Sequence, residues 1–119
     1  MRTVRESEHT KVECLDEPGA GGACHHYEVI NSKPPSEKDL KLLGLLGFQK
    51  GPIQEAGVNG LQNEDLLAIV IDRLTGFQSG EFACNQNALA LSACLTAIRT
   101  LDERTADRKA RNVEGKSEA

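Results

Sequence analysis

The sequence predicts an α+β protein in which a small N-terminal antiparallel β-sheet precedes a C-terminal antiparallel two-helix hairpin. Two short segments rich in strand-forming residues flank a glycine-rich loop and indicate the sheet. Two longer segments carry apolar residues at three- and four-residue steps, with a short connection between them, and indicate the hairpin. At 119 residues the chain has the length of a single domain, 1–119.

The first part of the chain contains the predicted strands. Residues 1–8 are polar and are expected to form a flexible tail. Residues 10–15 and 24–30 have strand character, and the loop DEPGAGGA separates them. The sheet region is expected to cover residues 10–62.

The end of this region contains a predicted short helix. Ser36 and Asp39 resemble a capping box, which favours a helix reaching about Leu45. Residues 45–50 are a candidate third strand, and the glycines and proline beyond them favour a structured loop.

The hairpin is predicted over residues 63–111, with 112–119 as a C-terminal tail. Asn63 is the expected N-cap of the first helix, and Gly80 its expected C-cap. The second helix should run from about Asn85 to about Arg108. The apolar line of the first helix is Leu67, Val70, Leu74 and Phe77, and that of the second is Leu91, Cys94, Ile98 and Leu101.

Composition limits the possible partners. With three Phe, one Tyr and no Trp, the chain has few large anchors, so we expect its core to be completed by a second copy. A net charge of −4 argues against binding polymeric nucleic acid, although not against binding one small anion. No run approaches 18 apolar residues and the N-terminus has no apolar signal core, so we expect neither membrane association nor export by a signal peptide.

The four cysteines contain no CxxC pair. Cys24-His25-His26 suggests a metal site, but adjacent strand residues point to opposite faces, so the two histidines are not expected to serve one ion. Thiols buried or incidental in a reducing cytosol explain the pattern better. We therefore expect no metal and no cofactor.

Three arginines follow helical spacing at the end of the second helix. Arg104, Arg108 and Arg111 stand at i, i+4 and i+7 and should share one face, while Asp107 can pair with Arg111. Their charges favour either a solvated helix end or a clamp for phosphate oxygens.

Phe77 and Asn87 lie at the other end of the predicted hairpin. Phe77 fits either core packing or stacking on a base, and Asn87 fits either a loop hydrogen bond or recognition of a base edge. Arg104 lies 17 residues beyond Asn87, which is about 25 Å along a helix. One small ligand cannot easily span this distance, so we expect any such pocket to be shared between two antiparallel copies.

Several motifs resemble, in order, the phage Thoeris anti-defence sponge family. They are FQKGP, GVNG, the ExLL helix ending in FQ, and RxxxR followed by VEG. The resemblance covers about residues 27–30 and 48–115. It implies a sheet with a helical hairpin, assembling as homodimers or as higher oligomers such as hexamers.

The same resemblance implies a small-molecule ligand. Members capture glycocyclic ADP-ribose, and relatives hold cyclic di- or trinucleotides at a second site. By motif match, Phe77, Asn87, Arg104 and Arg108 would form the ADP-ribose-type pocket. The remaining predicted ligand-binding residues are Phe48, Gln49, Arg111, Val113 and Glu114.

Two positions depart from the usual family ending RGVEGT. Asn112 replaces glycine, and asparagine is the next best residue where φ is positive, so the turn should persist. Lys116 replaces threonine, which removes a hydroxyl and adds a charge.

We therefore expect a non-enzymatic protein that sequesters a cyclic nucleotide signal in the host bacterial cytoplasm. One alternative is a nucleotide-cleaving enzyme with Glu114 or His26 as general base, although no nucleophile is evident beside either. Another is a helical-hairpin module that binds a host protein.

Overall fold

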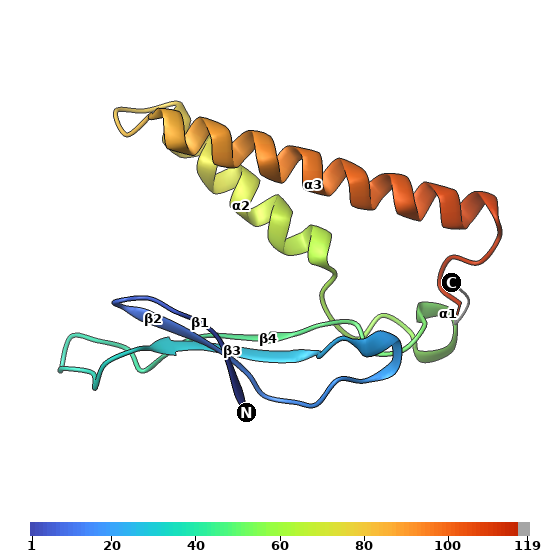
Figure 1. The fold of residues 1–119 in the computed structure, drawn as a ribbon, viewed down its shortest axis with the longest axis horizontal. Helices are drawn as coiled ribbons and strands as arrows, with labels where there is room; N and C mark the ends of the chain where they lie inside the picture. The colour runs from blue at the N-terminus through green and yellow to red at the C-terminus, as the bar shows by residue number, and fades with distance from the viewer. Residues whose placement is uncertain (117–119) are drawn as a thin grey trace. The chain divides into compact units, whose positions relative to one another are not determined.

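The computed structural model describes residues 1–116 and contains a four-stranded sheet followed by helices, which confirms the predicted α+β class (Figure 1). The chain divides into two compact units, Met1–Leu61 and Gln62–Ala119. Whether these two units act as one domain stays a prediction. No helix among the described residues is long and apolar enough to span a membrane.

The first unit is built on an antiparallel meander. Its strands are β1 (Arg2–Glu6), β2 (Thr10–Cys14), β3 (His26–Asn31) and β4 (Leu42–Gly47), and each pairs with the next along the chain. A 3-10 turn, η1 (Ala20–Gly22), and a short helix, α1 (Ile53–Ala56), lie in the connections.

The predicted flexible tail at residues 1–8 is wrong, because β1 lies within it. The backbone N–H of Ser7 donates to the carbonyl oxygen of Thr10 at 2.8 Å and closes a tight β1–β2 hairpin. Thr3 Oγ1 also donates to Glu13 Oε1 at 3.2 Å across the two strands. Pairing with β2 therefore orders a segment whose polar composition indicated disorder.

The predicted short helix up to Leu45 is also wrong. Ser36 and Asp39 do interact as a capping pair would: Ser36 donates from N and Oγ to Asp39 Oδ2 at 3.0 and 2.9 Å. They close only a single turn, and the chain enters β4 at Leu42. The strand predicted over residues 45–50 therefore corresponds to β4, which begins earlier. Its pairing with β3 outweighs the local helix-start signal.

The second unit is the predicted helical hairpin, formed by α2 (Asn63–Gln78) and α3 (Asn85–Ala110), which pack against each other (Figure 1). The caps lie next to the predicted residues: Gln62 rather than Asn63 caps the start of α2, and Ser79 rather than Gly80 caps its end. The N–H of Gln62 donates to Asp65 Oδ2 at 2.8 Å, which stabilises the first turn. At the start of α3, Cys84 Sγ accepts from the N–H of Asn87 at 3.4 Å.

Neither unit has a developed apolar core in one copy. Cys14, at 1 % exposure, is the one buried apolar residue among those the structure describes. Arg108 is the one buried residue of α3, and α2 has none. The hairpin instead exposes several large apolar side chains: Ile69, Val70, Phe77, Phe82 and Leu89.

Candidate functional site

The hairpin tip brings two predicted ligand-binding residues to the same end of the second unit. Phe77 lies in the last turn of α2 with 43 % of its surface exposed. Asn87 lies in the first turn of α3, and its Nδ2 donates to the carbonyl oxygen of Phe82 at 3.5 Å. This bond is long, so the Asn87 amide is held only weakly by the loop.

Arg73 also belongs to this end of the hairpin, although it was not among the predicted site residues. Its guanidinium carbon lies 5.8 Å from the centroid of the Phe77 ring, which is cation–π distance. The i to i+4 spacing of the two residues on a helix was the available signal. The tip therefore combines an accessible ring, an amide and a positive charge.

The far end of α3 is organised by Arg108. This residue is only 6 % exposed. Its Nε donates to Glu114 Oε2 at 3.1 Å, and its Nη2 donates to the carbonyl oxygens of Val113 and Lys116 at 2.8 and 3.2 Å. Three predicted ligand-binding residues, Arg108, Val113 and Glu114, thus do come together, but through a turn that folds over the guanidinium.

Asn112 makes that turn possible. Its φ is 59°, in the left-handed region, which confirms the expectation that asparagine preserves the turn at this position. Of the predicted tail at 112–119, residues 113–116 are therefore anchored to α3, and 117–119 lie outside the described residues.

The other two arginines differ from Arg108 in environment. Arg111 caps the helix rather than continuing it, and its Nε donates to Asp107 Oδ2 at 3.1 Å, as the spacing predicted. Arg104 is exposed on the helical part of α3. The single arginine face expected from the spacing is thus divided between one exposed helical residue, one buried residue and one cap.

Phe48 and Gln49 lie in the first unit, in a loop that comes after β4. The Phe48 ring packs edge-on against Tyr27, with centroids 5.7 Å apart and planes at 89°. Gln49 Nε2 donates to the carbonyl oxygens of Gly51 and Gly57 at 3.1 and 2.7 Å, while its Oε1 accepts from the N–H of Asn59 at 2.9 Å. Both side chains have a structural role within the loop.

Hydrogen bonds and close packing in this loop explain two of the sequence motifs. Asn59 bonds to both backbone groups of Lys50, at 2.8 Å each, and links GVNG to FQKGP. A Cβ atom at Gly60 would lie 2.4 Å from the carbonyl carbon of Phe48, so only glycine fits. Neither Asn59 nor Gly60 was predicted individually, although both stand inside a motif that signalled the family.

The two ends of the hairpin lie far apart. Because α3 is one continuous helix, Asn87 and Arg104 are separated by about 25 Å along its axis. The helix has 26 residues against the 16 of α2, and its second half extends past the start of α2 (Figure 1).

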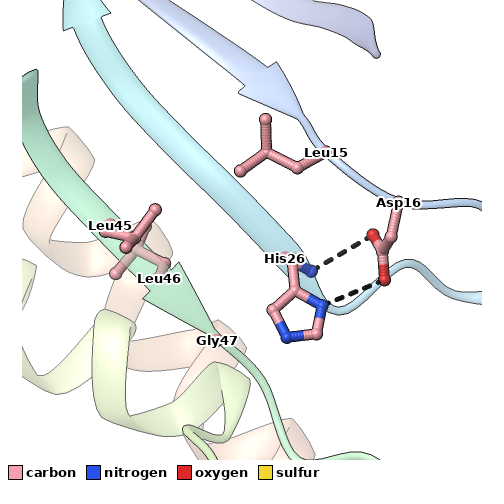
Figure 2. Close-up of a pocket in the computed structure, with 6 residues that line it drawn as sticks. All are labelled: Leu15, Asp16, His26, Leu45, Leu46 and Gly47. Atoms are coloured by element: carbon pink, nitrogen blue, oxygen red, sulfur yellow. Dashed lines mark hydrogen bonds and ion pairs between the residues drawn. The ribbon is translucent and has the colours of Figure 1, made fainter.

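The first unit contains an open cleft of about 550 Å³ (Figure 2). None of the nine predicted ligand-binding residues lines it; its lining residues are Leu15, Asp16, His26, Leu45, Leu46 and Gly47. Figure 2 shows the His26 ring turned toward Asp16, with Nδ1 to Oδ2 at 3.3 Å.

The chemistry of this cleft does not suit a phosphate. Desolvation raises the pKa of Asp16, but the backbone N–H groups of His26 and His25 and the His26 ring outweigh it and lower the pKa to about 2. The carboxylate is therefore charged at neutral pH and repels anions. His26 lies beside Asp16 in this cleft, and the enzyme alternative stays a prediction.

Comparison with known proteins identifies close relatives. Residues 45–106, which include the loop after β4 and most of the hairpin, match the family described as Acb2/Tad1, hairpin domain. A protein of Bacillus phage SBSphiJ7 named Thoeris anti-defense 1 is 47 % identical over 95 residues, covering 79 % of this chain and 67 % of that protein.

Proposed function

Because the chain belongs to the Acb2/Tad1 family of phage anti-defence proteins, we propose that it blocks Thoeris immunity by sequestering a cyclic nucleotide signal. The proposed ligand is glycocyclic ADP-ribose, with cyclic di- or trinucleotides as ligands of a second site. The protein acts in the cytoplasm of the infected bacterium and holds its ligand without cleaving it.

The observation that carries the proposal is the separation of suitable groups at the two ends of the helical hairpin. The exposed Phe77 ring and the weakly held Asn87 amide are suited to a base, and Arg104 is suited to a phosphate. Asn87 and Arg104 lie about 25 Å apart along α3 in one copy. In an antiparallel pair of hairpins, the tip of one copy lies beside the arginine end of the other, which forms two equivalent pockets.

The exposed apolar surface of the hairpin supports such a homo-oligomer. Ile69, Phe82 and Leu89 are each more than half exposed in a single copy. The second half of α3 extends beyond α2, so α2 leaves this part of the helix uncovered. Burying these side chains would supply the core that each copy lacks.

Isothermal titration with glycocyclic ADP-ribose tests the ligand. We expect tight binding at about one ligand per chain, near nanomolar, which corresponds to about −12 kcal/mol. Arg104→Ala should weaken binding at least tenfold, whereas Arg99→Ala removes the same charge from an exposed position on a different face of α3 and should change it little. Ligand recovered intact after denaturation would exclude cleavage.

A mixing experiment tests the shared pocket. Phe77→Leu keeps an apolar side chain but removes the ring face, and Arg104→Ala removes the phosphate contact. If each pocket takes these residues from different copies, mixed dimers regain one intact pocket of two, so an equimolar mixture should bind tightly at about a quarter of wild-type stoichiometry. No recovery on mixing would place both residues in one copy and refute the shared pocket.

The exposed apolar face also favours a second candidate function, a hairpin that binds a host protein. No heat with any cyclic nucleotide, together with a stable complex with a host protein, would support this candidate over the first.

A further inference from the structure

A cluster of side chains of the types that bind metals lies in the first unit, whereas Phe77, Asn87 and Arg104 of the proposed nucleotide pocket belong to the second unit. The ligand atoms of Cys14, Asp16 and Cys24 all lie within 4.8 Å of one another. Cys14 ends β2, Asp16 comes two residues later, and Cys24 precedes β3. The glycine-rich connection between the two strands therefore begins and ends at this cluster.

His25 supplies a second, independent observation. This residue is only 7 % exposed, and its Nδ1 is buried without a hydrogen bond to any of residues 1–116. The same atom lies 3.9 Å from Asp16 Oδ2, a ligand atom of the cluster. A buried nitrogen without a partner is costly, and a missing ligand explains it.

The loop holds the His25 ring in place. A Cβ atom at Gly19 would lie 3.0 Å from Cε1 of the ring, so the loop backbone packs directly against it. The N–H of Gly19 donates to the carbonyl oxygen of Ala23 at 2.9 Å and closes the loop over the ring.

The carboxylate is oriented by surrounding donors, as metal-bound carboxylates usually are. Asp16 accepts from the backbone N–H of His25 at 3.0 and 3.1 Å and from that of His26 at 3.2 Å. The exposed His26 ring lines the cleft, and its Nδ1 lies 3.3 Å from Asp16 Oδ2 (Figure 2).

The charges near the cluster also suit a divalent cation. Two thiolates, one carboxylate, a neutral imidazole and a divalent ion sum to one negative charge. Arg2 Nη2 lies 4.0 Å from Cys24 Sγ and would balance that charge from outside the ligand set. The β1 strand that carries Arg2 pairs this residue with Cys14.

We propose that Cys14, Cys24, Asp16 and His25 Nδ1 bind one zinc ion that anchors the β2–β3 loop to the sheet. Paired thiolates with imidazole and carboxylate favour zinc over magnesium or calcium. A unit of this size with one buried apolar residue gains from such a crosslink. The proposal departs from the expectation of no metal, which considered the two histidines but not the approach of Cys14 and Asp16.

Titration of the reduced, chelator-treated full chain with Co²⁺, followed by Zn²⁺, tests the site. We expect thiolate-to-Co²⁺ charge-transfer absorption that saturates at one ion per chain and disappears when Zn²⁺ displaces it. Cys24→Ser and Asp16→Asn should each weaken the affinity at least tenfold. The control Cys84→Ser/Cys94→Ser removes both thiols of the helical hairpin and should leave the spectrum unchanged.

A second measurement on the wild-type chain needs no variant that might misfold. Zn²⁺ should slow alkylation of the partly exposed Cys24 at least tenfold while the exposed Cys84 reacts as before. An unchanged alkylation rate at Cys24, or Co²⁺ binding without a charge-transfer band, would overturn the proposal. So would a charge-transfer band that survives in folded Cys24→Ser.

Discussion

Arg108 and Glu114 form an ion pair that closes the end of the helical hairpin, with Nε donating to Oε2 at 3.1 Å. The Arg108 side chain is 8 % exposed, and Glu114 lies six residues later, beyond the helix end. A side chain that spacing suggested as part of a phosphate clamp therefore holds its own chain first. This changes which substitutions can test ligand binding.

Arg108→Ala should destabilise the folded protein by about 2 kcal/mol. The substitution leaves a carboxylate and two carbonyl oxygens without their charged donor, and such hydrogen bonds contribute about 1.5–3 kcal/mol. Urea unfolding followed by circular dichroism measures the change. Arg104→Ala, at an exposed position of the same helix, should change stability by less than about 0.5 kcal/mol. If Arg108→Ala lowered the free energy of unfolding no more than Arg104→Ala does, the Arg108 contacts would not have this stabilising role.

Replacing Asn112 by glycine should leave the protein stable, whereas replacing it by alanine should destabilise the protein. Its φ of 59° costs a residue with a Cβ about 1–2 kcal/mol, a cost that asparagine partly offsets by local hydrogen bonding. Asn112→Gly should therefore leave the free energy of unfolding unchanged or raised, and Asn112→Ala should lower it by about 1 kcal/mol. If alanine were as stable as glycine in denaturant unfolding, the turn would not have this conformation in solution.

Gly60→Ala should be the most damaging alanine substitution in the loop after β4. The new methyl would lie 2.4 Å from the Phe48 carbonyl carbon and 2.7 Å from the Gln49 nitrogen, and overpacking of this kind costs about 1–3 kcal/mol or more. Gly44→Ala in the same unit is the matched control, because a methyl there meets nothing within 4 Å. Thermal unfolding should show a clear fall in Tm for Gly60→Ala and little change in Tm for Gly44→Ala.

Gln49 and Asn59 should be energetically coupled. The backbone N–H of Asn59, which alanine would keep, donates to Gln49 Oε1. The Gln49 and Asn59 side chains both bond to the backbone across the same loop, so each helps to order the bonds that the other makes. Each single alanine variant should cost about 1 kcal/mol, and the double variant should cost less than the sum. A double-mutant cycle in urea measures the coupling; strictly additive losses would show that the two side chains act separately.

The helices were predictable because their signals are local. Three- and four-residue apolar steps, acidic residues at one end and short loop length define α2 and α3 almost to the residue, and the Asp107–Arg111 pair agrees with i to i+4 geometry. Asn112 likewise adopts the positive φ expected from its residue type. Such features depend on neighbours within one or two helical turns, and these neighbours can be read directly from the sequence.

The features that the sequence did not predict depend on partners distant in the chain or on a choice between several local conformations. β1 was missed because its polar residues become ordered only by pairing with β2, and the Ser36–Asp39 turn gives way to β4 because β3 lies beside it. Arg108 was expected either to be solvated or to clamp a phosphate, but the chain reverses at Asn112 and covers it. Cys14, Asp16 and Cys24 converge because a loop closes between two paired strands. Local periodicity and capping thus identify the hairpin from the sequence, whereas strand pairing and chain reversal, which bring distant residues together, are decided only by the tertiary structure.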